Sequence, residues 1–136
     1  MTFQLLGLDH VVFRVRDIDR ALAFYRDVLG CALERSLEDM GLYQLRAGRS
    51  LIDLVPVESE LGRMGGAAPG EDGRNVDHIA LRIEPFDPAA LRAHLKAHGI
   101  EIGEVARRYG AEGQGPSIYI QDPDGNTVEL KGPPEE

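Results

Sequence analysis

The sequence lacks the features that mark a secreted or membrane protein. It contains a single cysteine, Cys31, so no disulfide can form within the chain, which agrees with a reducing compartment. Its opening, MTFQLLGLDH, has neither the basic nor the long apolar segment of a secretory signal. No apolar run approaches the roughly 20 residues of a membrane-spanning helix. We therefore expect a cytoplasmic protein without a membrane partner, in which Cys31 is a small buried thiol.

Basic residues are also fewer than acidic ones. The 136 residues include 23 acidic and 15 basic side chains, which gives a formal net charge of −8 at pH 7. Long-range repulsion then opposes every encounter with phosphate backbones, so we do not expect nucleic acid as a partner. The apolar fraction of 43% is enough for the core of one domain.

One sequence pattern occurs twice in the chain. GLDHVVFRV at residues 7–15 and NVDHIALRI at residues 75–83 both place Asp-His ahead of an alternating apolar run, 68 positions apart. The alternation predicts strands over residues 7–15 and 76–83. Each strand is followed by an aspartate that can cap a helix, by apolar residues at helical spacing, and by a closing glycine.

Three strand-like segments follow each predicted helix. They lie at residues 31–37, 42–47 and 50–57 in the first copy, and at 100–108, 116–121 and 126–131 in the second. The turn sequence QDPDGNT predicts a hairpin between the last two strands. The glycine-rich RYGAEGQGPS is either a mobile loop over a cleft or a plain hairpin connection.

Each copy is therefore predicted to be a βαβββ module, within one α+β domain over residues 1–136. Module 1 is expected at about residues 5–58 and module 2 at about residues 75–132. The glycine-rich stretch between them, at about residues 59–74, is expected to be a linker without regular structure that can also cover a site.

Two histidines and two carboxylates occupy equivalent positions in the modules. His10 and His78 stand in the first strands, while Asp53 in LIDLVP and Glu129 in TVELKG stand in the last strands. Side chains at equivalent positions of symmetrically paired modules project toward one place. Imidazole nitrogens and carboxylate oxygens together suit a divalent first-row metal. The sequence thus predicts a metal site made of these four residues.

Three further side chains are candidates for contacting a substrate. Arg14 shares the strand face of His10, so it can reach a substrate carboxylate or pair with an acid in the cavity. Tyr43 and Tyr109 can line a cleft, although an aromatic residue in a strand usually serves packing.

These modules, with the opening LDHVVFRVRDIDRALAFYRDVLG and the ending SIYIQDPDGNTVEL, resemble the vicinal oxygen chelate superfamily. It is also called the glyoxalase/bleomycin-resistance/extradiol-dioxygenase superfamily. The resemblance implies that the modules form a mixed, curved sheet around a metal cleft, with one divalent ion per cleft (Zn, Ni, Mn, Co or Fe). It implies His10, His78 and Glu129 as ligands, with Asp53 where glyoxalase I enzymes have glutamate. Because aspartate is one methylene shorter, Asp53 is either a fourth ligand or a nearby base.

The resemblance implies a glyoxalase-like lyase or isomerase acting on a small, oxygen-rich substrate, with Glu129 and Asp53 as the catalytic carboxylates. An extradiol-type dioxygenase and a fosfomycin-resistance-type transferase or hydrolase are alternatives. For the latter, Ser117 and Tyr119 match hydroxyls that hold a phosphonate. A bleomycin-resistance type of protein, which sequesters a ligand unchanged, is the alternative outside enzymes. The family also implies a homodimer, sometimes with ligands from both chains.

Overall fold

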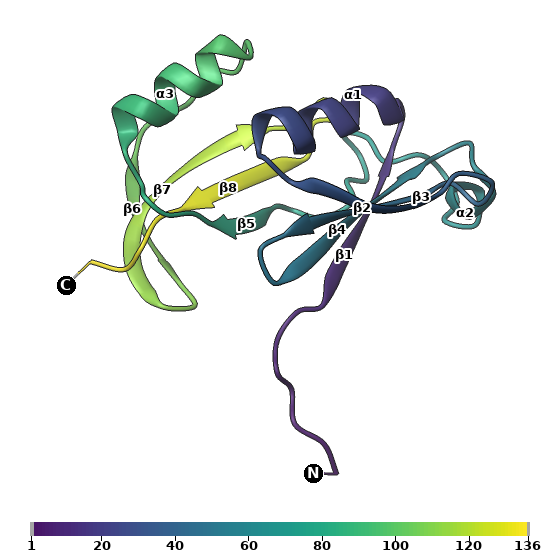
Figure 1. Cartoon of the computed structure of the whole chain (residues 1–136), viewed down its shortest axis with the longest axis horizontal. Coiled ribbons are helices and arrows are strands. Elements are labelled where there is room, and N and C mark those ends of the chain that lie inside the picture. The colour runs from purple at the N-terminus through teal and green to yellow at the C-terminus, as the bar shows by residue number, and fades with distance from the viewer. Residues whose placement is uncertain (1, 136) are drawn as a thin grey trace. The chain divides into compact units, whose positions relative to one another are not determined.

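The repeated sequence folds into two copies of one sheet topology. The structure, a computed structural model, describes residues 2–135 and divides into two units, the first ending at Gly73 and the second beginning at Arg74. The strand order is β1-β4-β3-β2 in the first unit and β5-β8-β7-β6 in the second. In each sheet the first and last strands of the module run parallel, and the other pairs are antiparallel (Figure 1). The predicted α+β class and its two βαβββ modules are confirmed.

Among the described residues of the first unit, 2–73, seven elements follow one another in the chain. They are β1 (His10–Val15), α1 (Ile18–Ala23), the π-helical turn η1 (Phe24–Val28), β2 (Ala32–Leu37), β3 (Leu42–Ala47), β4 (Ser50–Pro56) and α2 (Glu60–Arg63). The carboxylate of Asp17 caps α1 by accepting from the backbone N–H groups of Asp19 and Arg20. Gly30 has a φ of 78°, the left-handed conformation in which the helical segment was predicted to end.

In the second unit, five elements lie within the part that the structure describes, residues 74–135. They are β5 (Ile79–Arg82), α3 (Pro88–Ala97), β6 (Ala106–Gly110), β7 (Gly113–Gln121) and β8 (Thr127–Lys131). Asp87 caps α3 through the N–H of Ala90, and Pro88 occupies the first turn, where its missing N–H costs nothing. The cap and the closing Gly99, with a φ of 75°, are both as predicted.

The apolar face of the first sheet packs against its helical segment. Phe13 and Leu54 face one another across β1 and β4 and are fully buried. The ring of Phe13 lies 6.4 Å from that of Tyr25, which η1 contributes. Full burial of such side chains stabilises the fold by about 1.5–3 kcal/mol each. Cys31 is buried beside this core, and burial raises the pKa of its thiol, as expected for a structural cysteine.

Several element boundaries differ from the sequence prediction. The first strand begins at His10 rather than at residue 7, and Leu8 is exposed. The second module's first strand covers Ile79–Arg82 only. Strand β6 begins at Ala106, and its pairing with β7 makes RYGAEGQGPS a hairpin rather than a mobile loop. The linker contains α2, because the Ser59 hydroxyl caps it by accepting from the N–H of Gly62.

The turn between β7 and β8 is held by one buried carboxylate. Asp122 accepts hydrogen bonds from the backbone N–H of Asp124 at 2.9 Å, and from the backbone N–H and side-chain amide of Asn126 at 2.8 Å each. Gly125 supplies the left-handed residue, with a φ of 83°. Asn126 in turn accepts from the Asn75 amide at 3.1 Å, just ahead of β5. The predicted hairpin is confirmed, and it also holds the segment that leads into β5.

Replacing Asp122 by alanine should lower the free energy of unfolding by about 3 kcal/mol. The substitution removes three hydrogen bonds to a charged acceptor and leaves Asn126 buried without them. Urea denaturation followed by circular dichroism measures the change. Asp39→Ala, which removes an exposed turn carboxylate, is the matched control and should change stability by less than about 0.5 kcal/mol. Equal stability of the two variants would contradict the assigned role of Asp122.

Candidate metal-binding residues

The parallel pairing of β1 with β4 brings His10 and Asp53 together. Asp53 pairs with Val12, and His10 lies two residues before Val12, so both side chains project from the same face of the sheet. His10 Nε2 lies 4.0 Å from Asp53 Oδ2, and the Asp53 side chain is only 4% exposed. Gln44 lies opposite Asp53 on the neighbouring strand β3, and its side-chain amide donates to both Asp53 carboxylate oxygens at 3.3 and 3.4 Å. The strand register thus forms the first imidazole–carboxylate pair.

The second unit builds the same pair through β5 and β8. Glu129 pairs with Ala80, and His78 stands two residues before Ala80, immediately ahead of β5. His78 Nε2 lies 3.4 Å from Glu129 Oε1, and the Glu129 side chain is 7% exposed. Tyr119 is the partner of Glu129 on β7, and its ring meets the His78 imidazole edge-on at 5.6 Å. The two modules therefore present equivalent pairs, as their duplication suggests.

Two aspartates that sequence reasoning did not assign contact the other nitrogen of each imidazole. Asp9 Oδ2 lies 2.7 Å from His10 Nδ1, and Asp77 Oδ2 lies 2.7 Å from His78 Nδ1. The hydrogen bond to Asp9, and then the charge of Asp53, raise the pKa of His10. The signal was present in the sequence, since Asp-His stands at the same place in both copies.

The donor set fits a divalent first-row metal. Neutral imidazole Nε2 and carboxylate oxygen are ordinary ligands of such ions. Two ligands at about 2.1 Å from one cation lie at most roughly 4.2 Å apart, and the N···O separations of 3.4 and 4.0 Å satisfy that limit. Within residues 2–135, however, no group of three or more His, Cys, Asp or Glu side chains is gathered so as to hold an ion. The four predicted ligands stand as two pairs, one in each unit.

Ser117 and Tyr119 lie on the same sheet face as Glu129, and Arg108 joins them there. Ser117 is fully buried, and its hydroxyl accepts a hydrogen bond from Arg108 Nη1 at 2.7 Å. The Arg108 guanidinium stacks over the Tyr119 ring, with its carbon 4.4 Å from the ring centroid. Cation, hydroxyl and ring form one cluster beside the His78–Glu129 pair.

The other substrate-contact candidates lie elsewhere. Tyr43 pairs with Leu54, on the apolar face of its sheet and therefore opposite His10. Tyr109 is exposed on the side of β6 away from Arg108. We therefore leave both tyrosines out of the proposed site.

The Arg14 guanidinium is engaged by the linker. It donates to the backbone carbonyls of Gly62 at 3.4 Å, Gly66 at 3.0 Å and Ala67 at 2.9 Å. These contacts hold the last turn of α2 and the residues that follow it. Anchoring of the linker therefore accounts for an arginine on the strand face that also carries His10. A contact between Arg14 and a substrate stays a prediction.

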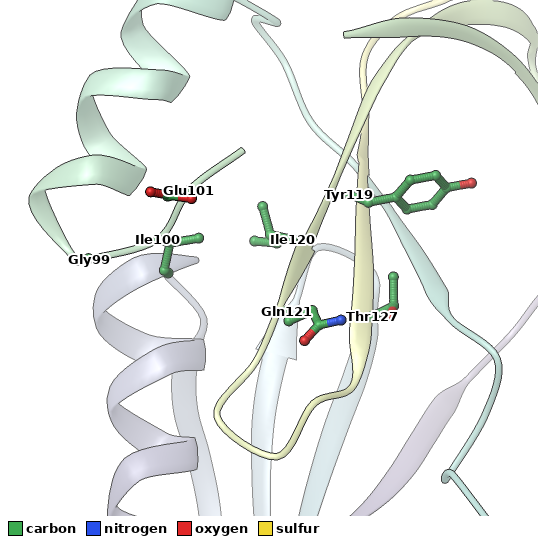
Figure 2. A pocket seen from close by; sticks show the side chains of 7 residues that line it. All are labelled: Gly99, Ile100, Glu101, Tyr119, Ile120, Gln121 and Thr127. Atoms are coloured by element: carbon green, nitrogen blue, oxygen red, sulfur yellow. The ribbon is translucent and has the colours of Figure 1, made fainter. Parts of the chain in front are cut away.

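A pocket in the second unit lies apart from the imidazole–carboxylate pair. It is lined by Gly99, Ile100, Glu101, Tyr119, Ile120, Gln121 and Thr127. Figure 2 shows Ile120 directed toward Ile100, while the Tyr119 ring extends to the opposite side of β7. His78 and Glu129 are not among its lining residues, so we do not assign it to the proposed metal chemistry. No helix within residues 2–135 is long and apolar enough to cross a membrane.

Comparison with known families agrees with this architecture. Residues 7–130 match the model of the Glyoxalase/Bleomycin resistance protein/Dioxygenase superfamily. The chain belongs to this superfamily, and the resemblance seen in the sequence is confirmed.

Curated relatives include enzymes of two kinds. A lactoylglutathione lyase of Haemophilus influenzae is 32% identical over 124 residues, covering 89% of this chain and 88% of that protein. A lactoylglutathione lyase of Arabidopsis thaliana is 31% identical over 132 residues, 91% of this chain, which spans only 44% of that longer protein. The metallothiol transferase FosB of Shouchella clausii is 28% identical over 124 residues, covering 91% of this chain and 78% of that protein.

Solved structures support the same fold. The virulence protein STM3117 of Salmonella typhimurium superposes with a TM-score of 0.77 at 27% identity, covering 96% of this chain and 98% of that one. The fosfomycin resistance protein FosX of Listeria monocytogenes gives 0.69 at 22% identity, covering 96% and 95%, and so speaks for the fold alone.

If Arg14 anchors the linker, its replacement should expose the chain around α2. We expect Arg14→Gln to speed tryptic cleavage after Arg63 severalfold, because the carbonyls of residues 62–67 lose their donor. Mass spectrometry of timed digests identifies the cut. Arg26→Gln, which changes an exposed side chain of η1, is the control and should leave that cleavage rate unchanged. Equal rates in both variants would contradict the anchoring role.

Proposed function

We propose that this protein is a metal-dependent, glyoxalase-like lyase or isomerase that acts on a small, oxygen-rich substrate. His10, His78 and Glu129 hold one divalent ion, and Asp53 is the fourth ligand or the base. The observation that carries the proposal is the repeated pair, in which a half-exposed imidazole nitrogen faces a carboxylate that is almost fully buried. Buried carboxylates are costly unless they are paired or coordinate a cation. The lactoylglutathione lyases among the relatives support this reaction class.

The chain's own groups divide the chemistry between them. A bound divalent ion supplies a Lewis acid for neighbouring substrate oxygens. Asp53 then accepts a proton from the carbon beside a substrate carbonyl and returns it to the adjacent carbon. Asp53 suits this role because it is held less closely by an imidazole. Asp53 Oδ2 lies 4.0 Å from His10 Nε2, whereas Glu129 Oε1 lies 3.4 Å from His78 Nε2. Gln44 holds the Asp53 carboxylate in place through both oxygens. Glu129, on the longer side chain, serves chiefly as a ligand.

A fosfomycin-resistance-type transfer is the second candidate. The cluster of Arg108, Ser117 and Tyr119 favours it, since a guanidinium and two hydroxyls can receive an anionic group beside Glu129. The FosB relative supports the same reading. In that reaction a thiol or water opens a strained ring on the bound substrate.

Metal binding tests the site directly. Protein freed of metal and titrated with Zn²⁺, Ni²⁺ or Mn²⁺ in a calorimeter should bind about one ion per proposed cleft. His10→Ala and His78→Ala should each weaken metal binding more than about 100-fold. The loss of a residue that only contacts a metal ligand already lowers affinity about 10–100-fold, and the loss of a ligand should cost more. His94→Ala, which removes an exposed side chain of α3, should bind like the wild type. Unchanged binding in both ligand variants would remove the proposed site.

Turnover separates the reaction classes. Isomerisation of a hemithioacetal by the metal-loaded protein, lost in Asp53→Asn and Glu129→Gln, is the expected result. Ring opening of an epoxide by a thiol would favour the second candidate, and oxygen uptake with a catechol would indicate dioxygenase chemistry. A ligand that binds tightly and leaves unchanged would replace the enzyme proposal with sequestration.

We also propose that the protein is a homodimer. An extended segment leads into β1 (Figure 1). Four apolar side chains of this segment are largely exposed to solvent, namely Phe3, Leu5, Leu6 and Leu8. Such apolar exposure is typical of surfaces that a partner covers. Light scattering should give twice the chain mass of 14.9 kDa, and the double variant Leu6→Asp/Leu8→Asp should shift the protein toward monomer. Met64→Asp, at another exposed apolar residue, is the control. A monomeric wild type would refute the dimer.

A further inference from the structure

Each histidine of the proposed site makes a short contact that the proposed reaction does not require. The carboxylate of the preceding aspartate lies 2.7 Å from Nδ1 in both modules. The aspartate side chains are 91% and 92% exposed, so packing does not force these contacts. Neighbouring residues in a strand project to opposite faces. The contact is possible because Asp9 and Asp77 both precede the strands β1 and β5.

The short distance decides where a neutral imidazole carries its proton. Such a ring has one N–H and one lone pair, and the stronger acceptor fixes which nitrogen holds the proton. For His10, Asp9 offers an oxygen at 2.7 Å from Nδ1, against 4.0 Å between Nε2 and Asp53. For His78 the two distances are 2.7 Å to Asp77 and 3.4 Å to Glu129. Only the aspartates lie at an ideal hydrogen-bond distance, which is about 2.7–3.2 Å.

Without these aspartates the buried carboxylates would compete for the proton. A ring protonated on Nε2 would donate toward Asp53 or Glu129, and that nitrogen would have no lone pair for a cation. With the proton on Nδ1, Nε2 is bare and faces the carboxylate. Carboxylate contacts of this kind orient imidazole ligands in many metal sites.

We propose that Asp9 and Asp77 are positioning residues, each of which holds the ring proton of the following histidine on Nδ1 and keeps Nε2 free for the ion. The inference rests on the proposed function in taking Nε2 as the ligand atom. The duplication supports it, because two segments 68 residues apart reach the same contact at the same distance.

The tautomers can be measured in metal-free protein. Long-range ¹H–¹⁵N spectra of histidine-labelled protein, recorded well above the imidazole pKa, distinguish protonated from bare ring nitrogens. We expect the Nδ1–H form at both rings in the wild type. Asp9→Ala should move His10 alone toward the Nε2–H form, and Asp77→Ala should move His78 alone, so each variant is the other's control. His10→Ala and His78→Ala assign the signals. Wild-type rings protonated on Nε2, or tautomers unchanged in the variants, would overturn the proposal.

Metal affinity gives the second readout. Asp9→Ala and Asp77→Ala should each weaken Zn²⁺ binding by about 10–100-fold while keeping its stoichiometry. Asp9→Asn should recover part of the loss, because its amide oxygen still accepts from Nδ1–H. Unfolding midpoints should match the wild type, since the aspartates are exposed.

The two proposals fail in different ways. If wild-type protein binds no metal, the proposed function falls while the tautomer measurement still tests the positioning role. If metal binds and both aspartate variants bind it equally well, the positioning role falls and the metal site stands.

Discussion

In each unit the first strand runs parallel to the last, and the rest of the proposed site depends on that pairing. The register opposes Val12 with Asp53 and Ala80 with Glu129, so a histidine two residues earlier projects from the same face as the acid. An antiparallel hairpin would join strands adjacent in sequence. The parallel pairing instead brings His10 to Asp53, 43 positions away in sequence, and His78 to Glu129, 51 positions away. A slip by one residue would turn the imidazole to the apolar face and separate it from the carboxylate.

The same sheets explain how the acids can remain buried. On the opposite face of the first unit, Phe13, Leu54 and Tyr25 build the core, so the register that buries them also fixes Asp53. Removing a carboxylate from water costs of the order of several kcal/mol without compensation. Gln44 offsets part of that cost for Asp53, because its side-chain amide donates to both carboxylate oxygens. A cation bound beside either buried carboxylate would offset more of it. The histidines, being half-exposed, keep the pairs open to an ion or a substrate.

The sequence predicted the fold well because the fold depends on local patterns repeated in two copies. Alternation and helix caps located every strand and both long helices, and duplication aligned His10 with His78 and Asp53 with Glu129. Strand ends and side-chain partners could not be predicted, because they depend on contacts distant in sequence. Arg14 shares its strand face with His10, yet the carbonyls that it binds are some 50 residues away. The sheet face on which Tyr43 lies could not be predicted either, because the pairing of β3 with β4 determines it.

The Asp122 turn has a consequence for how this scaffold tolerates change. Its carboxylate holds Asn126, whose own side chain holds Asn75, so the starts of β8 and β5 are tied to a single loop. Insertions there would displace Glu129 and His78 together. At the β6–β7 reversal, Glu112 instead accepts a hydrogen bond from Arg82 of β5 at 3.0 Å, in an exposed ion pair. A change of length in this hairpin would therefore alter a surface contact and leave the buried Asp122 turn in place.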